Sequence, residues 1–262
     1  MLKQDVAAGP AYQIRFYRTG RCCIAGRYAY KHLFQDRDHS FFLYISVISR
    51  PGFTALVDVG MQDVAEMNRG AGFLMTKLIH QEPDEDLLSI LAQAKRIPEE
   101  IDMILLTHCH YDHCSNLDVF PHARVVIPHK AWLDWHRDPQ TAVYLHEGLL
   151  SELEALEQQG RLILEDEGLV APGIGVRRVG GHSRCSQFIY ANTSQGVAVF
   201  SGDTVQMFGN LEQDDIISIC EDEAECWRAL EIVREEADLL IPGHDPLVLE
   251  RYPGGLPAGA DG

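Results

Sequence analysis

The residues with the clearest chemical potential lie in one stretch, Thr107-His-Cys-His-Tyr-Asp-His-Cys-Ser-Asn116. It places three imidazoles and a carboxylate within six residues: His108, His110, Asp112 and His113. Imidazole nitrogen and carboxylate oxygen are the ligands that zinc and its neighbours in the transition series prefer. A histidine-rich surface loop is the alternative interpretation. The stretch directly follows an apolar run, however, and the end of a buried strand can direct several side chains toward one point. The pattern therefore predicts a metal site.

Three further candidates follow apolar runs later in the chain: His182, Asp203 and His244. A glycine directly precedes each of them, and glycine allows the backbone to approach a crowded site closely. Each signal alone is weak, because Gly-Asp and Gly-His are common in turns. Together with the histidine stretch they indicate a larger site.

The segments between these candidates show mainly strand patterns, with helices interspersed. We expect strands at 12–17, 41–49, 53–58, 101–106, 124–127, 161–165, 174–179, 187–191, 197–201 and 238–241. We expect amphipathic helices at 85–96, capped by Asp84, at 146–159 and at 222–236. The order shows no strict strand–helix alternation, which favours two sheets packed face to face with helices on the outside. We expect a single domain over residues 1–252 and a poorly ordered tail over the glycine- and proline-rich residues 253–262.

The composition excludes several classes of function. Asp and Glu number 39 against 22 Lys and Arg, a net charge of −17, which argues against nucleic acid as a partner. No apolar run approaches the ~18–20 residues of a membrane span, and residues 1–20 do not read as a secretory signal. The seven cysteines form no Cys-x-x-Cys pair, so we expect reduced thiols in a cytoplasmic protein.

The motifs in combination resemble the metallo-β-lactamase superfamily. The resemblance is carried, in order, by DVG (58–60), HCHYDH (108–113), GGH (180–182), SGD (201–203) and PGH (242–244). It extends from about residue 40 to residue 250. It implies an α+β fold, the αββα sandwich of two packed mixed sheets with helices on the outer faces, and a dinuclear metal site at one edge.

The resemblance also implies a ligand set. The first metal ion would be bound by His108, His110 and His182, the second by Asp112, His113 and His244, with Asp203 bridging both. Two divalent cations per chain are implied, zinc first, with iron, manganese or cobalt also accepted by such ligands. Asp58 is a candidate for orienting a metal-bound imidazole from behind, or alternatively a turn cap.

Within the superfamily, the chain is most similar to the N-acyl-homoserine-lactone lactonases. The segments that carry this likeness are Asn116, Phe120-Pro121, 125–135 and 160–182. The implied reaction is attack of a metal-bridging hydroxide on the carbonyl of a carboxylic ester, a lactone in particular. Asp112 would act as the catalytic residue that orients the hydroxide and passes its proton to the leaving group.

Two departures concern the substrate rather than the metal. The lactonases commonly have Tyr three residues after the bridging Asp, where this chain has Gln206, and they continue the third motif as GHTPGH, where it has GHSRCS (181–186). We expect Gln206, Arg184 and Trp132 to contact the substrate.

Other functions remain open at this point. A glyoxalase-II-like thioesterase would share all seven ligands, but the segment 221–238 is acidic where glutathione binding would need a basic patch. A hydrolase of another small ester or amide, and a metal-binding module without catalysis, are further alternatives. The expected partner is a small-molecule ester or lactone, with no membrane or nucleic acid, and a homodimer is compatible with the resemblance.

Overall fold

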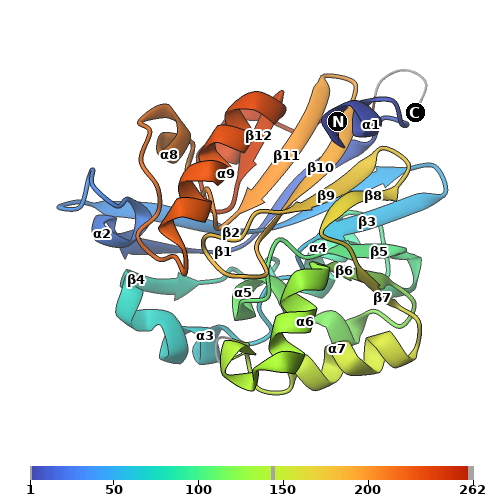
Figure 1. Cartoon of the computed structure of the whole chain (residues 1–262), viewed down its shortest axis with the longest axis horizontal. Helices are drawn as coiled ribbons and strands as arrows, with labels where there is room; N and C mark the ends of the chain where they lie inside the picture. The colour runs from blue at the N-terminus through green and yellow to red at the C-terminus, as the bar shows by residue number, and fades with distance from the viewer. Residues whose placement is uncertain (1, 143–144, 259–262) are drawn as a thin grey trace.

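The computed structural model describes residues 2–142 and 145–258 as two β-sheets packed face to face between layers of helices (Figure 1). The larger sheet runs in the order β4 (Met75–His80), β1 (Gln13–Ala25), β2 (Asp38–Arg50), β3 (Phe53–Val57), β5 (Met103–Leu105), β6 (Arg124–Ile127) and β7 (Leu162–Leu164). The smaller sheet runs in the order β12 (Leu239–Pro242), β11 (Gly196–Gly202), β10 (Gln187–Thr193), β9 (Ile174–Arg178) and β8 (Glu167–Ala171). Both sheets mix parallel and antiparallel pairs. The αββα sandwich expected from the sequence is confirmed.

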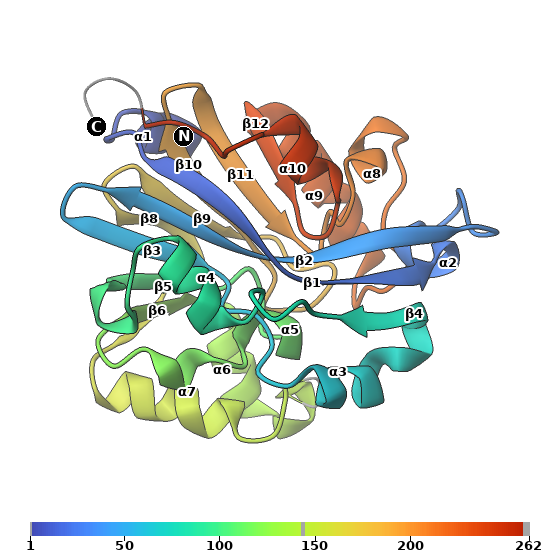
Figure 2. The ribbon, with the colours of Figure 1, turned by 180° about the vertical axis from the view of Figure 1, so that it is seen from behind.

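The helices cover the outer faces, as the two opposite views show (Figures 1 and 2). The helices are α1 (Leu2–Ala7), α2 (Gly26–Ala29), α3 (Val64–Ala71), α4 (Leu87–Gln93), α5 (Tyr111–Cys114), α6 (His129–Arg137), α7 (Leu149–Gln158), α8 (Phe208–Glu212), α9 (Glu223–Glu236) and α10 (Leu247–Arg251). Short 3₁₀ turns lie at η1 (Gly72–Leu74), η2 (Pro98–Glu100), η3 (Leu117–Val119) and η4 (Pro139–Ala142). Within the described residues, no helix is both long and apolar enough to cross a membrane.

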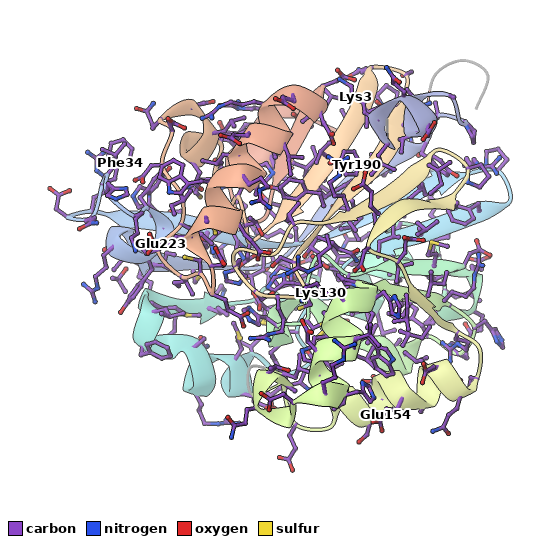
Figure 3. The ribbon with its side chains drawn as sticks, viewed as in Figure 1. Lys3, Phe34, Lys130, Glu154, Tyr190 and Glu223 are labelled. Carbon is purple, nitrogen blue, oxygen red and sulfur yellow. The ribbon has the colours of Figure 1, made fainter. Side chains whose placement is uncertain are left out.

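Alternation along the strands divides the apolar side chains between two main cores. In β5, Met103 and Leu105 point into the core that also contains the inner face of the smaller sheet and the buried side of α9. Ile104 points to the opposite face, where α4, α6 and α7 pack on the larger sheet. Tyr190 of β10, labelled in Figure 3, is fully buried and donates its hydroxyl hydrogen bond to Glu236 of α9 at 2.6 Å. Because β5 is buried on both faces, the residues that follow it start from a fixed position.

Most predicted elements appear, but the structure adds others that the sequence did not predict, among them α1, α6, α8, α10 and β8, and it differs at further points. Helix α4 begins later than predicted because Asp86, rather than Asp84, caps it by accepting the Ser89 N–H at 3.0 Å. The segment that forms α3, η1 and β4 was not predicted, since its polarity and short apolar spacings resemble a loop. The expectation of a poorly ordered tail from residue 253 is wrong for its described part, because Leu256 is 2% exposed and pairs with Ile14. The remainder of that tail, 259–262, lies outside the described residues.

Candidate metal centre

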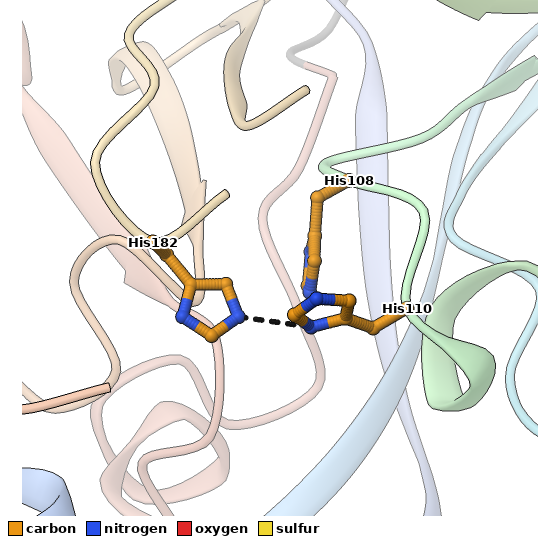
Figure 4. Close-up of side chains that lie close together, drawn as sticks. All are labelled: His108, His110 and His182. Atoms are coloured by element: carbon orange, nitrogen blue, oxygen red, sulfur yellow. Dashed lines mark hydrogen bonds between the residues drawn. The ribbon is translucent and has the colours of Figure 1, made fainter. Parts of the chain in front are cut away.

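Four loops that follow strands bring the predicted ligands together at one end of the sandwich. The histidine stretch follows β5 of the larger sheet, whereas His182, Asp203 and His244 follow β9, β11 and β12 of the smaller sheet. Their donor atoms form three groups, each within 4.8 Å: His108, His110 and His182; His108, His113 and Asp203; and Asp112, His113 and His244. The first and third groups coincide with the two ligand sets implied by the sequence resemblance. Figure 4 shows the first group, with His182 Nε2 3.0 Å from His110 Nδ1.

Asp203 lies between the two groups. Its Oδ1 is 2.9 Å from His244 Nε2, and its Oδ2 is 3.7 Å from His182 Nε2. The carboxylate therefore reaches toward both sets of imidazoles, as a bridging ligand would have to.

Local packing holds the histidine stretch in this position. Cys109 and Cys114 are fully buried in the core beneath α6 and α7, so they anchor the backbone between the ligands. All seven cysteines are free thiols. Neither Cys109 nor Cys114 lines the cavity described below, which fits a packing role for both.

Hydrogen bonds at the rear of the site fix how the imidazoles are presented. Asp58, at the end of β3, has its Oδ2 2.8 Å from His113 Nδ1 and accepts the Thr107 hydroxyl at 2.9 Å. Since that hydroxyl donates to Asp58, it can only accept from His108 Nδ1, 3.2 Å away. In the same way, His182 Nδ1 lies 2.7 Å from the carbonyl of Ile219. These contacts place the Nδ1 proton behind each ring and leave the Nε2 lone pair facing inward.

The protein's own charges prepare these groups to bind cations. Burial lowers the pKa of His108 and, with the imidazole of His182, lowers that of His110 to about 3, so both rings are neutral. Burial alone would raise the pKa of Asp112, but His113 outweighs it and lowers the pKa to about 2. Burial likewise opposes the charged form of Asp203, yet His244 and His113 hold its pKa well below the usual value.

The donor set fits a divalent metal ion. The Nε2 atom of His108 is buried and has no hydrogen-bond partner among the described residues, whereas His113 Nε2 faces carboxylate oxygens of Asp112 and Asp203, each 3.3 Å away. A buried lone pair without a donor is unfavourable, and neutral imidazoles beside ionised carboxylates are the combination that transition metals bind. A cation would satisfy all of these groups at once.

A cavity of about 370 Å³ opens directly onto this cluster. Five of the candidate ligands line it: His110, Asp112, His182, Asp203 and His244. Its other walls are mostly apolar and come from β1, β2 and the α3–η1–β4 segment: Ile24, Phe41, Leu43, Met67, Leu74, Met75 and Ile79. None of the described residues that line it is Lys or Arg.

The three residues expected to contact the substrate lie in different surroundings. Gln206 lines the cavity, is 2% exposed and donates its amide hydrogen bond to Asp203 Oδ2 at 3.2 Å. Trp132 is buried in the core between α6 and the larger sheet, and Arg184 forms an ion pair with Glu221 at 3.3 Å. Neither of these two is among the residues that line the cavity, so the cavity gives no support to a substrate contact for either.

Four polar residues of the cavity were not singled out from the sequence: Cys22, Glu66, Tyr111 and His146. The Tyr111 hydroxyl accepts the Asp63 N–H at 3.1 Å and donates to Glu66 Oε2 at 3.2 Å. His146 packs edge-on against the Tyr111 ring, with 5.5 Å between the ring centroids. Of these four residues, only Tyr111 could be identified from the sequence, because it lies in the histidine stretch beside Asp112. The other three are distant from it in the sequence.

Comparisons with known proteins agree with this architecture. Residues 41–244 match the sequence model described as Metallo-beta-lactamase superfamily. The chain is 30% identical over 164 residues to human metallo-beta-lactamase domain-containing protein 1, a match that covers 62% of this chain and only 54% of the human protein. It is 25% identical over 199 residues to N-acyl homoserine lactonase of Bacillus thuringiensis, covering 72% of this chain and 76% of that protein.

Solved structures extend the likeness to the fold of nearly the whole chain. An N-acyl homoserine lactone hydrolase with N-hexanoyl-L-homoserine bound at its catalytic metal centre superimposes with a TM-score of 0.74, at 18% identity, covering 93% of this chain and 96% of that one. AidC, a dizinc quorum-quenching lactonase in complex with its product, gives a TM-score of 0.63 at 16% identity, covering 97% of this chain and 96% of that one.

Proposed function

The chain belongs to the metallo-beta-lactamase superfamily, and we propose that it is a dinuclear metal-dependent hydrolase that opens a carboxylic ester, a lactone in particular. The observation that carries the proposal is the position of the His/Asp cluster, which forms one wall of a largely apolar cavity. Such a cavity suits a neutral ester with an apolar substituent. The names of the lactonase relatives support the choice of a lactone.

We propose that the two metal ions are held by the ligand sets given above, zinc being the first candidate. Such a pair, when bound, supplies a water of lowered pKa and polarises a carbonyl oxygen. Asp203 would contact both ions, and Asp58 would hold His113 in the orientation that ligation requires.

The remaining chemistry falls to residues that line the cavity. Asp112 is ionised and faces the cavity, so it can accept a proton at its carboxylate and return it to the departing oxygen. Gln206, already bound to Asp203 through its amide nitrogen, is placed to contact the substrate. Cys22 is not a nucleophile in this scheme, because burial raises the pKa of its thiol to about 12.

The cavity also argues against a thioesterase for glutathione conjugates. Such a substrate carries carboxylates, and the described lining offers no Lys or Arg to pair with them. Glu66 would add like-charge repulsion.

We also propose that the protein works in the cytoplasm, which its seven free thiols support.

The test is a substrate panel run on purified protein reconstituted with zinc or manganese. The panel contains N-acyl-homoserine lactones, unsubstituted lactones, aryl esters and S-acyl-glutathiones, with metal content measured in the same samples. We expect two metal ions per chain and turnover of lactones. Turnover of the thioester alone would replace the lactonase proposal with the thioesterase. Less than one metal ion per chain with no turnover would favour a binding module.

A further inference from the structure

Glu225 of α9 contacts the turn that carries His182. Its Oε2 accepts the backbone N–H of Gly181, the residue directly before the ligand, at 3.0 Å. Its Oε1 faces both terminal nitrogens of Arg178 at 3.2 Å. In Figure 3 the labelled Glu223, two residues earlier, marks the N-terminus of α9. The ion pair is largely sheltered, with side-chain exposures of 16% for Arg178 and 27% for Glu225.

The two members of the ion pair contact the turn at different points, Glu225 at Gly181 and Arg178 at Arg184. Arg178, the last residue of β9, also donates from Nε to the carbonyl of Arg184 at 2.9 Å, so it spans the turn from its start to its end. Gly180 and Gly181 have φ values of 68° and 81°. A Cβ at Gly180 would collide with the Glu225 carboxylate, and one at Gly181 would lie 2.8 Å from Cys226 Sγ. The two glycines therefore allow α9 to pack directly on the backbone of the turn.

The segment just before α9 holds the same turn at further points. His182 Nδ1 contacts the carbonyl of Ile219, and the N–H groups of Glu221 and Asp222 donate to the carbonyl of Gly181 at 2.8 and 3.0 Å. Hydrogen bonds to residues 219–225 thus fix both the ring of His182 and the backbone next to it. Gly181 is buried, so its N–H needs an acceptor, and a carboxylate fixed by Arg178 provides a charge-assisted one.

We propose that Glu225, kept in place by Arg178, is a positioning residue for His182, an inference that rests on the dinuclear centre proposed above. It acts through the Gly181 backbone and touches neither substrate nor metal. Without the carboxylate, the Gly181 N–H loses its acceptor, and the peptide group that precedes His182 is held less firmly. Metal–ligand distances tolerate shifts of only about 0.2 Å, so the site that contains His182 weakens.

The experiment compares cobalt binding by metal-free wild-type protein with that of three variants. Glu225→Ala removes the acceptor, Glu225→Gln retains an oxygen acceptor of the same reach, and Glu231→Ala is the control. Glu231 is an exposed glutamate of the same helix, so its replacement makes the same change in charge. Cobalt is used because its visible absorption reports ligand geometry, and unfolding temperatures of the metal-free proteins are recorded alongside.

We expect Glu225→Ala to weaken binding at one of the two sites by about 10–100-fold and to alter the cobalt spectrum. Glu225→Gln should restore most of the affinity and the spectrum, and Glu231→Ala should match wild type. If Glu225→Ala does not fold, Arg178→Gln, which frees the carboxylate, should show the same change in direction. Wild-type affinity and spectrum in Glu225→Ala, or in Arg178→Gln where that variant is used, would overturn the inference, as would a lower unfolding temperature with unchanged cobalt binding.

The two proposals fail in distinguishable ways. Cobalt binding that depends on Glu225 in a protein that hydrolyses no ester removes the proposed function and leaves the inference standing. Lactone turnover with cobalt binding that is independent of Glu225 does the reverse. A wild-type protein that takes up no cobalt overturns both.

Discussion

Asp58 Oδ2 lies 2.8 Å from His113 Nδ1, and both side chains are almost fully buried. The same oxygen accepts the Thr107 hydroxyl, which in turn contacts His108 Nδ1. One carboxylate therefore determines which nitrogen faces the centre in two imidazoles, one belonging to each proposed metal site.

Asp58→Asn is expected to weaken metal binding about 10–100-fold, because the carboxylate accepts at both oxygens. Oδ1 accepts the Thr107 N–H, Oδ2 faces His113 Nδ1 and the Thr107 hydroxyl, and the NH₂ group of an amide would have to face a donor at one of these positions. Metal content after dialysis and zinc competition titrations measure the loss. Asp102→Asn is the matched control, since Asp102 accepts the Thr54 N–H away from the cluster. Equal zinc affinity in Asp58→Asn and wild type would return Asp58 to the role of a turn cap.

Asp112→Asn should lower kcat for a lactone by about 100–10,000-fold, the range that proton transfer by a side chain contributes. The amide oxygen can still face a cation but cannot take up a proton. Rates must be expressed per bound metal ion, because Asp112 is also a candidate ligand. Wild-type hydrolysis at full metal content would remove Asp112 from the proton path.

Tyr111→Phe is expected to raise KM several-fold for esters with long acyl chains while changing kcat little. The lost hydroxyl connects α5 to Asp63 and Glu66, and α3 forms part of the apolar wall. Steady-state kinetics over a series of acyl lengths provide the measurement. Tyr252→Phe is the control, because it removes a hydroxyl bound to the Leu240 carbonyl away from the cavity. An equal effect on short and long chains would contradict the assignment.

Glu152→Gln should stabilise the protein more at pH 8 than at pH 5. Burial, with a smaller effect from Asp118, raises the pKa of Glu152 to about 7 from 4.5. A carboxyl with a raised pKa favours folding fully below the unfolded value, and this contribution is lost as the pH rises through 7. The glutamine variant should therefore unfold at a higher temperature at pH 8, by a few degrees, with little difference at pH 5. Parallel curves for the two proteins across this range would refute the shift.

The sequence was most informative where the chemistry is local. The histidine stretch contains four candidate ligands within six residues, and the glycine-preceded His182, Asp203 and His244 follow strongly apolar strands. The apolar run 125–127 coincides with the buried part of β6, because a strand buried on both faces has consecutive hydrophobic residues.

The cavity could not be predicted in the same way. Helix α3 has only eight residues and none of them is buried, so its short apolar face gives a weak signal in the sequence. Its contacts with Tyr111 show where it lies. Trp132 has an aromatic side chain of the kind that often contacts substrates, yet it packs in the core against the larger sheet. His146 lies far from the histidine stretch in the sequence, and nothing there shows that its side chain returns to the Tyr111 ring.

The separation of these parts has a consequence for how such proteins diverge. The candidate ligands lie in the loops after β5, β9, β11 and β12, whereas much of the apolar wall belongs to α3, η1 and the edge strand β4. Since α3 packs only on the smaller apolar cluster beside β1 and β2 and on neither main core, its residues can be exchanged during evolution at a lower cost to stability than core residues. Substitutions in residues 64–80 can therefore change which substrates the cavity accepts, while the candidate metal ligands stay unchanged.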